Sequence, residues 1–362
     1  MRAVILPGHG GPEVLSLEEV EDPDVGVGDV LVRLEGVGLN HLDLDIRAGV
    51  ARIELELPVI LGSEGVGRIE RVSPEAAGQW REGDRVMVAE EIPCGRCEVC
   101  VVGRQNLCMQ GSWLGSTRPG CYAELIAVPA DAVIALPEER PATDWAAVQA
   151  AFGTAWHMLI TRGGLRAGER VLVNAAGSGI GSAAVQIAKY AGATVLATAG
   201  SEPKLARARE LGADLTFDYS DAGWSDAVLE ATKGAGVDLV YDHVGGDVFV
   251  KSLDLTRPGG RIATCGAHAG ETVPLDIIEL FRAERTIIGS RCYTRSESET
   301  VIELVAAGHL DPVVDSVIAL DEIPEGHRRL EARAAFGKVV VTPQRLASGA
   351  PTAGPDVQAN HE

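Results

Sequence analysis

Aromatic side chains are scarce in this 362-residue chain, in which Phe, Trp and Tyr together make up only 4% of the residues. Long apolar runs are missing as well: none approaches the roughly 18 residues that a membrane-spanning helix needs. The N-terminal stretch MRAVILPGHGGPEVL also lacks the basic start and the long apolar segment of a signal peptide. We therefore expect a cytoplasmic protein that binds no membrane.

Positive charge is in short supply: 32 Lys and Arg residues face 52 Asp and Glu residues, which gives a formal net charge of -20. Such a chain repels phosphate backbones, so nucleic acid is not an expected partner. Disulfide bonds are not expected either. Cys121, Cys265 and Cys292 lie far apart in the sequence, and a reducing cytoplasm favours free thiols.

The hydrophobic pattern divides the chain into parts. Residues 1–145 contain short β-rich runs separated by Gly, Pro and Asp turns, which predicts an antiparallel, barrel-like domain. Residues 146–292 alternate apolar strands with amphipathic helical segments, which predicts a parallel sheet covered on both faces. Residues 293–343 return to strands around a helix, and we expect them to rejoin the first domain. Residues 344–362, rich in Ala, Gly and Pro, read as a disordered tail.

Four cysteines gather in the segment CGRCEVCVVGRQNLC, with two, two and seven residues between them. This spacing presents four thiolates to a single tetrahedral metal ion, and zinc is the usual one. Four protein ligands leave no open position for water or substrate, so the zinc would order a lobe of about residues 90–112 and take no part in chemistry. The alternative is a cluster of metal-free thiols. The predicted zinc ligands are Cys94, Cys97, Cys100 and Cys108.

A glycine-rich turn, NAAGSGIGSAAVQIAKYAGA, follows a predicted strand and begins a predicted helix. In that setting the backbone amides and the positive end of the helix dipole bind a pyrophosphate, as in dinucleotide-binding folds. The spacing departs from a strict G-x-G-x-x-G, and an ordinary strand-to-helix turn is the alternative. The predicted cofactor-binding residues are Ala176, Gly177, Ser178, Gly179, Ile180 and Gly181.

The second strand of this fold ends in TVLATAGSEPK, without the carboxylate that would bind a ribose 2'-hydroxyl. Ser201 offers a hydroxyl there, Lys204 on the next helical turn can pair with a 2'-phosphate, and Tyr219 can line the adenosine. NADPH is therefore the favoured cofactor. Glu202 is the exception: if its carboxylate turns towards the ribose, NADH is favoured, and otherwise it is an ordinary first-turn helix acid.

The nicotinamide end of the cofactor should meet the carboxyl ends of the next strands, because ligands bind at that edge of such sheets. The segments HVGG and TCGAH fall there and contribute His243, Val244 and Gly266. Lys338, in FGKVVV, is a further candidate for cofactor contact.

Taken in order, these motifs resemble the medium-chain dehydrogenase/reductase superfamily, which contains zinc alcohol dehydrogenases and quinone oxidoreductases. The matching segments are GDVLVRLEGVGLNHLDL, LPVILGSEGVGRIERV, the four-cysteine lobe, the GCYAEL turn and AAGSGIGSAAVQIAK. The resemblance implies a GroES-like β-barrel catalytic domain, a Rossmann domain with a doubly wound parallel sheet, and an active site in the cleft between them. It also implies homodimers or homotetramers, often joined through the Rossmann domains.

Alcohol dehydrogenases of this superfamily hold a second, catalytic zinc, and its ligand positions differ here. Asn40 replaces the cysteine, Ser63 replaces the histidine, and AAFGTAWHML at the domain junction offers no thiol or carboxylate. Leu42 also replaces the hydroxyl of the usual proton relay. An amide and a hydroxyl are poor zinc ligands.

Other uses of the residues around Asn40 stay open. His41, Asp43 and Glu64 are candidates for an unusual oxygen-rich metal site. The alternatives are that Asn40 and His41 line the substrate pocket, or that Asp43 simply caps a short helix.

Without a catalytic metal, alcohol oxidation loses the Lewis acid that acidifies the alcohol. Reduction of an electron-poor acceptor needs mainly orientation and hydrogen bonds. We therefore expect NADPH-dependent reduction of an activated C=C bond, as in an enone, or of a quinone, with Asn40 and His41 beside the acceptor oxygen. Three alternatives remain: an alcohol or aldehyde dehydrogenase, a biosynthetic enzyme acting on one elaborate intermediate, and a non-catalytic protein that binds NADPH.

Overall fold

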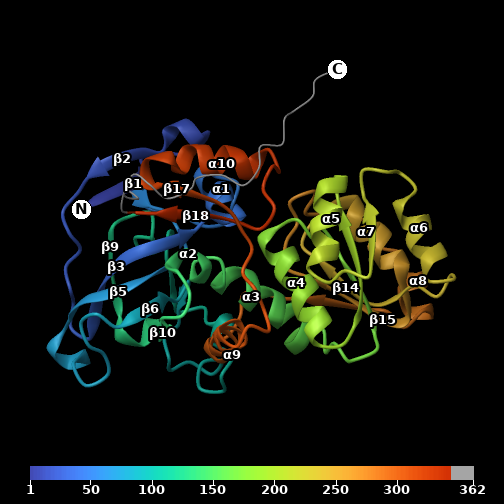
Figure 1. Cartoon of the computed structure of the whole chain (residues 1–362), viewed down its shortest axis with the longest axis horizontal. Helices are drawn as coiled ribbons and strands as arrows, with labels where there is room; N and C mark the ends of the chain where they lie inside the picture. The colour runs from blue at the N-terminus through green and yellow to red at the C-terminus, as the bar shows by residue number, and fades with distance from the viewer. Residues whose placement is uncertain (344–362) are drawn as a thin grey trace. The chain divides into compact units, whose positions relative to one another are not determined.

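The computed structural model describes residues 1–343, so the tail predicted for residues 344–362 lies outside the described residues. The chain folds into two compact units. Unit 1 contains Met1–Val102, Cys108–Ala147 and the described residues from 314 onward, and unit 2 contains Gly103–Leu107 and Val148–Val313. Each unit is built from its own strands and helices (Figure 1).

Unit 1 is built mainly from antiparallel β-strands, as the alternating pattern of its sequence predicts. Its largest sheet has the order β10-β6-β5-β3-β18-β17, with β9 also paired to β3. Smaller sheets join β2-β1-β4 and β7-β8. The strands are β1 (Arg2–Leu6), β2 (Ser16–Glu19), β3 (Asp29–Gly38), β4 (Val59–Ile60), β5 (Glu64–Val72), β6 (Arg85–Val88), β7 (Glu91–Ile92), β8 (Ser112–Trp113), β9 (Leu125–Pro129), β10 (Val133–Ala135), β17 (Val314–Ala319) and β18 (Lys338–Thr342). The helices are α1 (His41–Ala48), α2 (Ala142–Trp145) and α10 (Ile323–Glu331).

The core of unit 1 joins both ends of the chain. Leu34 and Val37 from β3 pack in one buried cluster with Val86 from β6 and with Val339 and Val341 from β18. Strand β18 pairs antiparallel with β3 and parallel with β17. The C-terminal strands therefore complete the sheet that the N-terminal strands begin.

Unit 2 contains the predicted parallel sheet, with the strand order β13-β12-β11-β14-β15-β16. All five neighbouring pairs in this sheet are parallel. The strands are β11 (Arg170–Val173), β12 (Thr194–Ala199), β13 (Leu215–Asp218), β14 (Val237–Asp242), β15 (Thr256–Thr264) and β16 (Thr286–Gly289). The helices are α3 (Gln149–Trp156), which a π-helical turn (His157–Arg162) continues, α4 (Gly179–Tyr190), α5 (Glu202–Glu210), α6 (Trp224–Ala231), α7 (Gly246–Leu255), α8 (Ile277–Arg282) and α9 (Arg295–Ala306).

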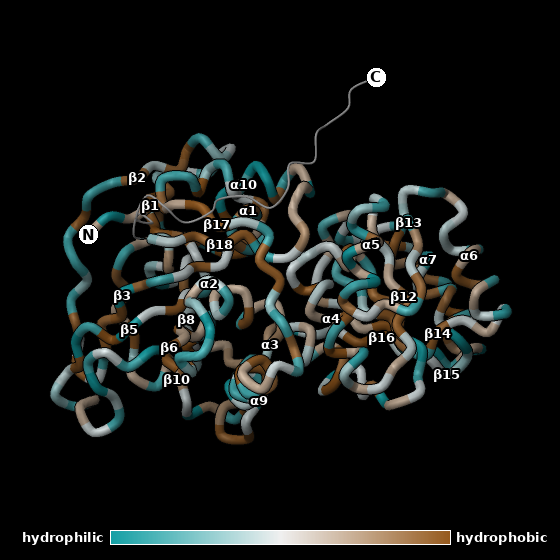
Figure 2. The backbone as a smooth tube through the Cα atoms, viewed as in Figure 1, coloured by the Kyte–Doolittle hydropathy of each residue, from teal (hydrophilic) through white to brown (hydrophobic). Residues whose placement is uncertain are grey.

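Strand β11 comes first in the sequence of unit 2 but lies inside the sheet: β12 and β13 are added on one side of it, and β14, β15 and β16 on the other. Right-handed crossovers then place α4 and α5 on one face and α6 and α7 on the other. Leu172, Val240 and Ile262 from the central strands form a buried cluster with Trp224 from α6. In Figure 2 the central strand β14 is mostly hydrophobic, whereas α5 is mostly hydrophilic. Both faces of the sheet are covered, and its strands accordingly read as continuous apolar runs.

The boundaries predicted from the sequence differ from these units in three places, of which the smallest is residues 146–147, which lie in unit 1. Residues 103–107 were expected in the first domain, but the Asn106 side-chain amide donates to the Arg291 carbonyl and the Arg291 guanidinium donates back to the Asn106 carbonyl, each at 2.8 Å. Residues 293–313 also belong to unit 2, because α9 packs against α3. A Cβ atom on Gly153 would lie only 2.6 Å from the Tyr293 ring. The return to unit 1 therefore falls at Val314.

None of the helices in residues 1–343 combines the length and the apolar surface needed to cross a bilayer.

Candidate active site

Strand register in unit 1 brings four polar side chains from distant parts of the sequence together. Gly38, the last residue of β3, pairs with Glu64 on one side and with Val340 on the other. The next residue, Leu39, donates its backbone N–H to the Val339 carbonyl at 3.0 Å. Asn40, Ser63, Glu64 and Lys338 therefore meet where β3 ends and α1 begins. We call these four residues the polar centre.

The Lys338 ammonium group connects the members of the polar centre. It donates hydrogen bonds to the Leu39 carbonyl at 2.9 Å, to the Asn40 side-chain oxygen at 2.7 Å and to the Glu64 carboxylate. An ammonium group has three N–H donors, so these acceptors use all of them. Lys338 and Glu64 are both buried, and each neutralises the charge of the other.

The side-chain amide of Asn40 has only one chemically sensible orientation. Its oxygen accepts from Lys338, and its nitrogen donates to Ser63 Oγ at 3.2 Å and to Glu64 Oε1 at 3.0 Å. A flipped amide would turn its NH₂ group towards the ammonium and its oxygen towards the carboxylate. Both amide protons are therefore committed within the polar centre.

Gly38 is a position where no side chain fits. A Cβ atom there would lie 2.3 Å from Glu64 Oε1 and 2.6 Å from the Ala146 carbonyl oxygen. The glycine thus allows the Glu64 carboxylate to lie directly against the strand, within reach of Lys338.

A second buried hydrogen-bond chain leads away from the start of α1. Asp43 accepts the backbone N–H of Asn40 at 2.8 Å and the hydroxyl of Tyr122 at 2.9 Å. His327 Nε2 lies 3.1 Å from the Tyr122 oxygen, and His327 Nδ1 lies 3.2 Å from Arg47 Nη1. A guanidinium can only donate, so Nδ1 accepts, and the proton of the neutral ring sits on Nε2. His327 then donates to Tyr122, which donates to Asp43.

Burial sets the protonation states along this chain. It raises the pKa of Asp43 to about 6, although the hydrogen bonds from Asn40 and Tyr122 act in the opposite direction. Burial, reinforced by the nearby Arg47 charge, lowers the pKa of His327 to about 3. Burial also raises the pKa of Tyr122 well above its ordinary value. The chain is therefore neutral at His327 and Tyr122 at physiological pH.

The residues of unit 1 that were predicted to contact substrate or cofactor have protein partners in this structure, and their roles stay predictions. Asn40 was expected to donate to the acceptor oxygen, but both of its amide protons are used by Ser63 and Glu64. Lys338 was expected to reach the cofactor, but its three donors are used by unit 1. His41 is exposed on the first turn of α1. Asp43 provides the side-chain half of a capping box, as its helix-capping alternative proposed.

The four predicted zinc ligands come together in unit 1. Their sulfur atoms all lie within 4.8 Å of one another, with Sγ–Sγ distances of 3.4 Å for Cys97 and Cys100 and 4.0 Å for Cys94 and Cys100. Tetrahedral zinc with bonds of about 2.3 Å needs sulfur atoms about 3.8 Å apart, so this group fits the ion. Within residues 1–343 it is the only set of three or more His, Cys, Asp or Glu side chains arranged to hold a metal. His41, Asp43 and Glu64 do not form the oxygen-rich site that was an alternative.

In unit 2, the glycine turn joins the end of β11 to the start of α4. Ala175 adopts a left-handed conformation with φ of 49°, and Ser178 is the N-cap of α4. The Ser178 hydroxyl accepts the Gly181 N–H at 2.9 Å. A Cβ atom on Gly181 would lie 2.3 Å from the Ala175 carbonyl oxygen, so only glycine permits this close approach. Ala176, Gly177, Gly179 and Ile180 complete the turn.

The end of β12 leads through Gly200 and Ser201 into α5. A Cβ atom on Gly200 would meet the Tyr219 ring at 3.0 Å, so Tyr219 packs directly over Gly200. Ser201 is the N-cap of α5, and Lys204 lies in its first turn. Glu202, which would favour NADH if it faced the ribose, forms an ion pair with Arg209 at 2.7 Å.

The ends of the next two strands lie against the glycine turn and against each other. His243, just after β14, is buried, and its Nε2 lies 3.0 Å from the Ser178 hydroxyl. A Cβ atom on Gly266, just after β15, would lie 2.7 Å from the His243 carbonyl oxygen. The Val244 carbonyl accepts the Ala269 N–H at 2.8 Å. His243 and Ser178 thus connect the two predicted parts of the cofactor site within unit 2.

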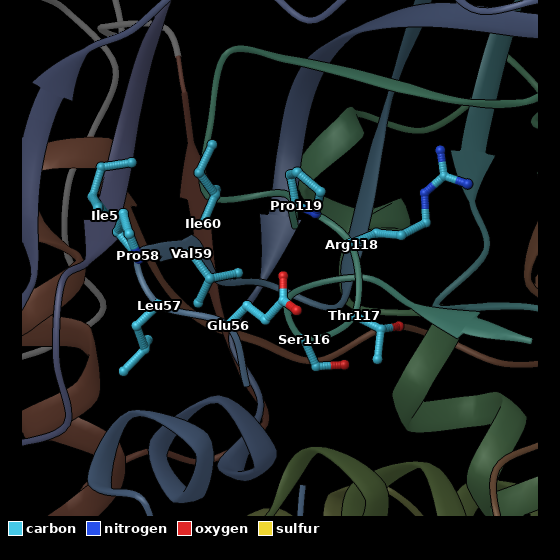
Figure 3. Close-up of a pocket in the computed structure, with 10 residues that line it drawn as sticks. All are labelled: Ile5, Glu56, Leu57, Pro58, Val59, Ile60, Ser116, Thr117, Arg118 and Pro119. Atoms are coloured by element: carbon cyan, nitrogen blue, oxygen red, sulfur yellow. The ribbon is translucent and has the colours of Figure 1, made fainter. Parts of the chain in front are cut away.

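Unit 1 also has a surface cavity of about 460 Å³ (Figure 3). Its wall is mostly apolar, and no member of the polar centre lines it. In Figure 3 the Arg118 guanidinium extends away from the other lining side chains. Its ionisable side chains are Glu56 and Arg118, and Ser116 and Thr117 add hydroxyl groups. The lining residues are Ile5, Glu56, Leu57, Pro58, Val59, Ile60, Ser116, Thr117, Arg118 and Pro119.

Sequence reasoning did not single out Arg47, Tyr122 or His327. Tyr122 lies in the GCYAEL turn, which served only for family recognition, and His327 lies in a segment predicted as an ordinary helix. The only sequence feature that could have drawn attention to them is that each is a polar residue in a segment that is otherwise apolar or predicted to be helical. No spacing rule connects them, because α10 packs against α1 from the far end of the chain.

Comparison with known proteins agrees with this arrangement. The family described as "Alcohol dehydrogenase GroES-like domain" matches residues 26–138, and the family described as "Zinc-binding dehydrogenase" matches residues 179–307. An acryloyl-coenzyme A reductase from Sulfurisphaera tokodaii is 30% identical over 95% of this chain and 100% of its own length. A 2-haloacrylate reductase from a Burkholderia species is 30% identical over 94% of this chain and 99% of its own length.

Solved structures show the same relationship. The crystal structure of an NAD-dependent alcohol dehydrogenase superposes with a TM-score of 0.91 at 42% identity and covers 95% of this chain and 100% of its own. This chain belongs to the medium-chain dehydrogenase/reductase superfamily, among the zinc-type alcohol dehydrogenase-like proteins, and is an NAD(P)H-dependent oxidoreductase. The predicted family and fold class, a GroES-like domain with a Rossmann domain, are confirmed. Membership also supports a nicotinamide cofactor and zinc.

Proposed function

We propose that the protein is an NADPH-dependent reductase of activated C=C bonds or quinones that works without a catalytic metal. One observation carries this proposal: the Lys338 ammonium donates to both Asn40 and Glu64, where alcohol dehydrogenases of the superfamily are expected to bind the catalytic zinc. An amide and a hydroxyl supply neither a thiolate nor an imidazole to a metal. The only carboxylate of the polar centre, Glu64, is already neutralised by Lys338.

The charge distribution favours reduction over alcohol oxidation. Oxidation needs a group that draws the proton from the alcohol, and the polar centre holds no unpaired base that would do so. Reduction of a conjugated C=C bond places negative charge on an oxygen, which hydrogen-bond donors stabilise. When bound, the reduced nicotinamide supplies the hydride.

Two relatives support the reductase assignment by name, because acryloyl-coenzyme A, a thioester, and 2-haloacrylate, a carboxylate, both contain a C=C bond next to a C=O carbon. The competing function is alcohol oxidation, which the name of the structural relative at 42% identity favours. Our proposal favours reduction over alcohol oxidation, because the polar centre lacks the thiolate and imidazole ligands of a catalytic zinc site.

NADPH is the proposed cofactor. Ser201 offers a hydroxyl at the end of β12, Lys204 follows in the first turn of α5, and Tyr219 flanks Gly200. Glu202 pairs with Arg209, which supports its reading as an ordinary helix acid. The name of the structural relative, an NAD-dependent enzyme, favours NADH, so the cofactor needs a direct test.

Two further features complete the proposal. The four-cysteine lobe holds one structural zinc, because its sulfur spacing fits a closed tetrahedral site. The protein forms a homodimer or homotetramer through the outer edge of the unit 2 sheet. There, β16 ends the sheet, and Ile277, Ile278 and Phe281 of α8 are exposed apolar side chains.

The deciding experiment follows NADPH oxidation with a panel of enones, enoyl thioesters, quinones and aldehydes, alongside alcohol oxidation with NADP⁺ and NAD⁺. We expect turnover of enones, enoyl thioesters or quinones and little oxidation of simple alcohols. Alcohol oxidation faster than every reduction would overturn the proposal, as would zinc-dependent turnover with about two zinc ions per chain.

A further inference from the structure

Ser63 has a feature that its neighbours in the polar centre lack. Its hydroxyl oxygen accepts a hydrogen bond from Asn40 Nδ2 at 3.2 Å, while its own proton has no acceptor among residues 1–343. The residue is only 2% exposed. A buried hydroxyl that keeps a proton without an acceptor is costly, unless a ligand supplies that acceptor.

The polar centre makes this proton a better hydrogen-bond donor. Lys338 donates to the Asn40 oxygen, and the Asn40 nitrogen donates to the Ser63 oxygen. Hydrogen bonds arranged in such a series polarise one another, so a hydroxyl that accepts from a charge-assisted chain donates more strongly. The chain also fixes the place of the Ser63 oxygen, because the Asn40 amide has one orientation. The only remaining freedom is rotation of the O–H bond.

We propose that the Ser63 hydroxyl is the catalytic hydrogen-bond donor to the carbonyl oxygen of an α,β-unsaturated carbonyl substrate, and that Asn40 is its positioning residue. This inference rests on the proposed reductase function. In the reaction the β-carbon gains a hydride from the reduced nicotinamide, and the π electrons of the C=C bond move to the carbonyl oxygen to form an enolate. Ser63 donates a hydrogen bond to that oxygen and keeps its proton. A proton from water then adds to the α-carbon and gives the saturated carbonyl product.

The first test compares Ser63→Ala with Ser73→Ala. Ser73 is also a buried serine of unit 1 whose hydroxyl accepts one hydrogen bond, from the Gly28 N–H at 3.1 Å, but it lies outside the polar centre. We expect kcat for an enone or enoyl thioester to fall about 100-fold in Ser63→Ala and to stay near the wild-type value in Ser73→Ala. NADPH affinity, followed by fluorescence, and the melting temperature should remain close to wild type in both.

The dependence on the acceptor separates a catalytic role from a structural one. A quinone is more electrophilic than an enone and depends less on a hydrogen bond to its oxygen. The fall in kcat caused by Ser63→Ala should therefore be much smaller with a quinone than with an enone. Equal losses with both acceptors, or an unchanged rate with the enone, would overturn the role of Ser63. Asn40→Ala, which leaves the hydroxyl in place but unsupported, should show a weaker form of the same acceptor dependence.

Failure of this inference differs from failure of the proposed function. If wild-type protein reduces enones and Ser63→Ala does so equally well, only the role of Ser63 is wrong. If wild-type protein reduces no enone, enoyl thioester or quinone and oxidises alcohols instead, the reductase function is wrong and the role of Ser63 fails with it.

Discussion

The Lys338 ammonium nitrogen lies 2.7 Å from the side-chain oxygen of Asn40, although 298 positions separate the two residues in the chain. This contact joins the last described strand of unit 1 to the start of its first α-helix. It brings the Lys338 ammonium to Asn40, which the resemblance aligns with a zinc ligand of the superfamily's alcohol dehydrogenases. In the proposed function, this protein cation takes part of the electrostatic place of a metal, is held on Glu64 and would act on substrate through Asn40 and Ser63.

Removal of this cation should destabilise unit 1. Lys338→Met keeps an unbranched side chain one atom shorter but leaves the Glu64 carboxylate buried without its counter-ion. We expect the free energy of unfolding to fall by about 3 to 5 kcal/mol, measured by urea denaturation. Lys189→Met is the matched control. It removes an exposed ion pair with Asp214, and its effect should stay within about 1 kcal/mol. Equal effects in the two variants would show that Lys338 is not a buried counter-ion.

Local motifs were predictable from the sequence because their geometry needs few distant contacts. Cys94, Cys97 and Cys100 lie on one short loop, and the Gly181 turn needs only the adjoining strand and helix. The alternation of strands and helices likewise reports burial on two faces of a sheet, which the structure reproduces.

The polar centre was predicted only in part. Asn40 and Ser63 could be placed by resemblance, but the sequence did not reveal which of their protons are committed. That depends on the register that pairs Gly38 with both Glu64 and Val340 and so brings Lys338 to Asn40. The donor role predicted for Asn40 stays a prediction, and in the structure its amide donates to Ser63 and Glu64.

Acidification should destabilise the protein through His327. Burial keeps the pKa of this ring at about 3 in the folded protein, against 6.5 in the unfolded chain. Between these pH values only the unfolded chain binds the proton. The contribution of His327 to stability is therefore complete above about pH 6.5 and is lost as the pH falls towards 3. His327→Gln should make the decline less steep by up to about 1.4 kcal/mol per pH unit, measured by denaturation from pH 4 to pH 6. His309→Gln, at an exposed position, should leave the slope unchanged.

Asp43 should have the opposite effect in the same pH range. Its pKa rises from 3.8 to about 6 on folding, so the folded protein binds the extra proton. Its contribution to stability is complete below about pH 3.8 and is lost as the pH rises through about 6. Asp43→Asn should therefore make the acid decline between pH 4 and pH 6 steeper, whereas His327→Gln makes it shallower. Changes of the same sign in both variants would contradict these protonation states.

Metal content should follow the cysteine lobe alone. We expect about one zinc ion per chain by elemental analysis, because the four thiols form a closed site. Cys100→Ser should lose this zinc, whereas Cys265→Ser, which changes a thiol outside the lobe, should retain it. A value near two would place a second metal in the protein and count against the metal-free polar centre.

A carboxylate at the end of β12 should weaken NADPH binding. Ser201→Asp brings a negative charge to the N-cap of α5, where we expect the 2'-phosphate, and should raise the Kd for NADPH at least about tenfold while changing that for NADH little. Fluorescence titration measures both constants. Ser296→Asp adds the same charge to the first turn of α9 and should change neither. Tighter binding of NADH than of NADPH by wild-type protein would reverse the cofactor assignment.

The outer edge of the unit 2 sheet should hold subunits together. Strand β16 has a neighbour on one side only, and Phe281 on the preceding helix is 62% exposed. An unpaired edge beside apolar side chains favours pairing with a second copy of the chain. Phe281→Asp should convert a dimer to monomers, or a tetramer to smaller species, in light scattering after size exclusion. Val50→Asp, at an exposed apolar position in unit 1, is the control and should leave the mass unchanged. A monomeric wild-type protein would remove the basis for this interface, because the apolar edge would then be stable in water without a partner.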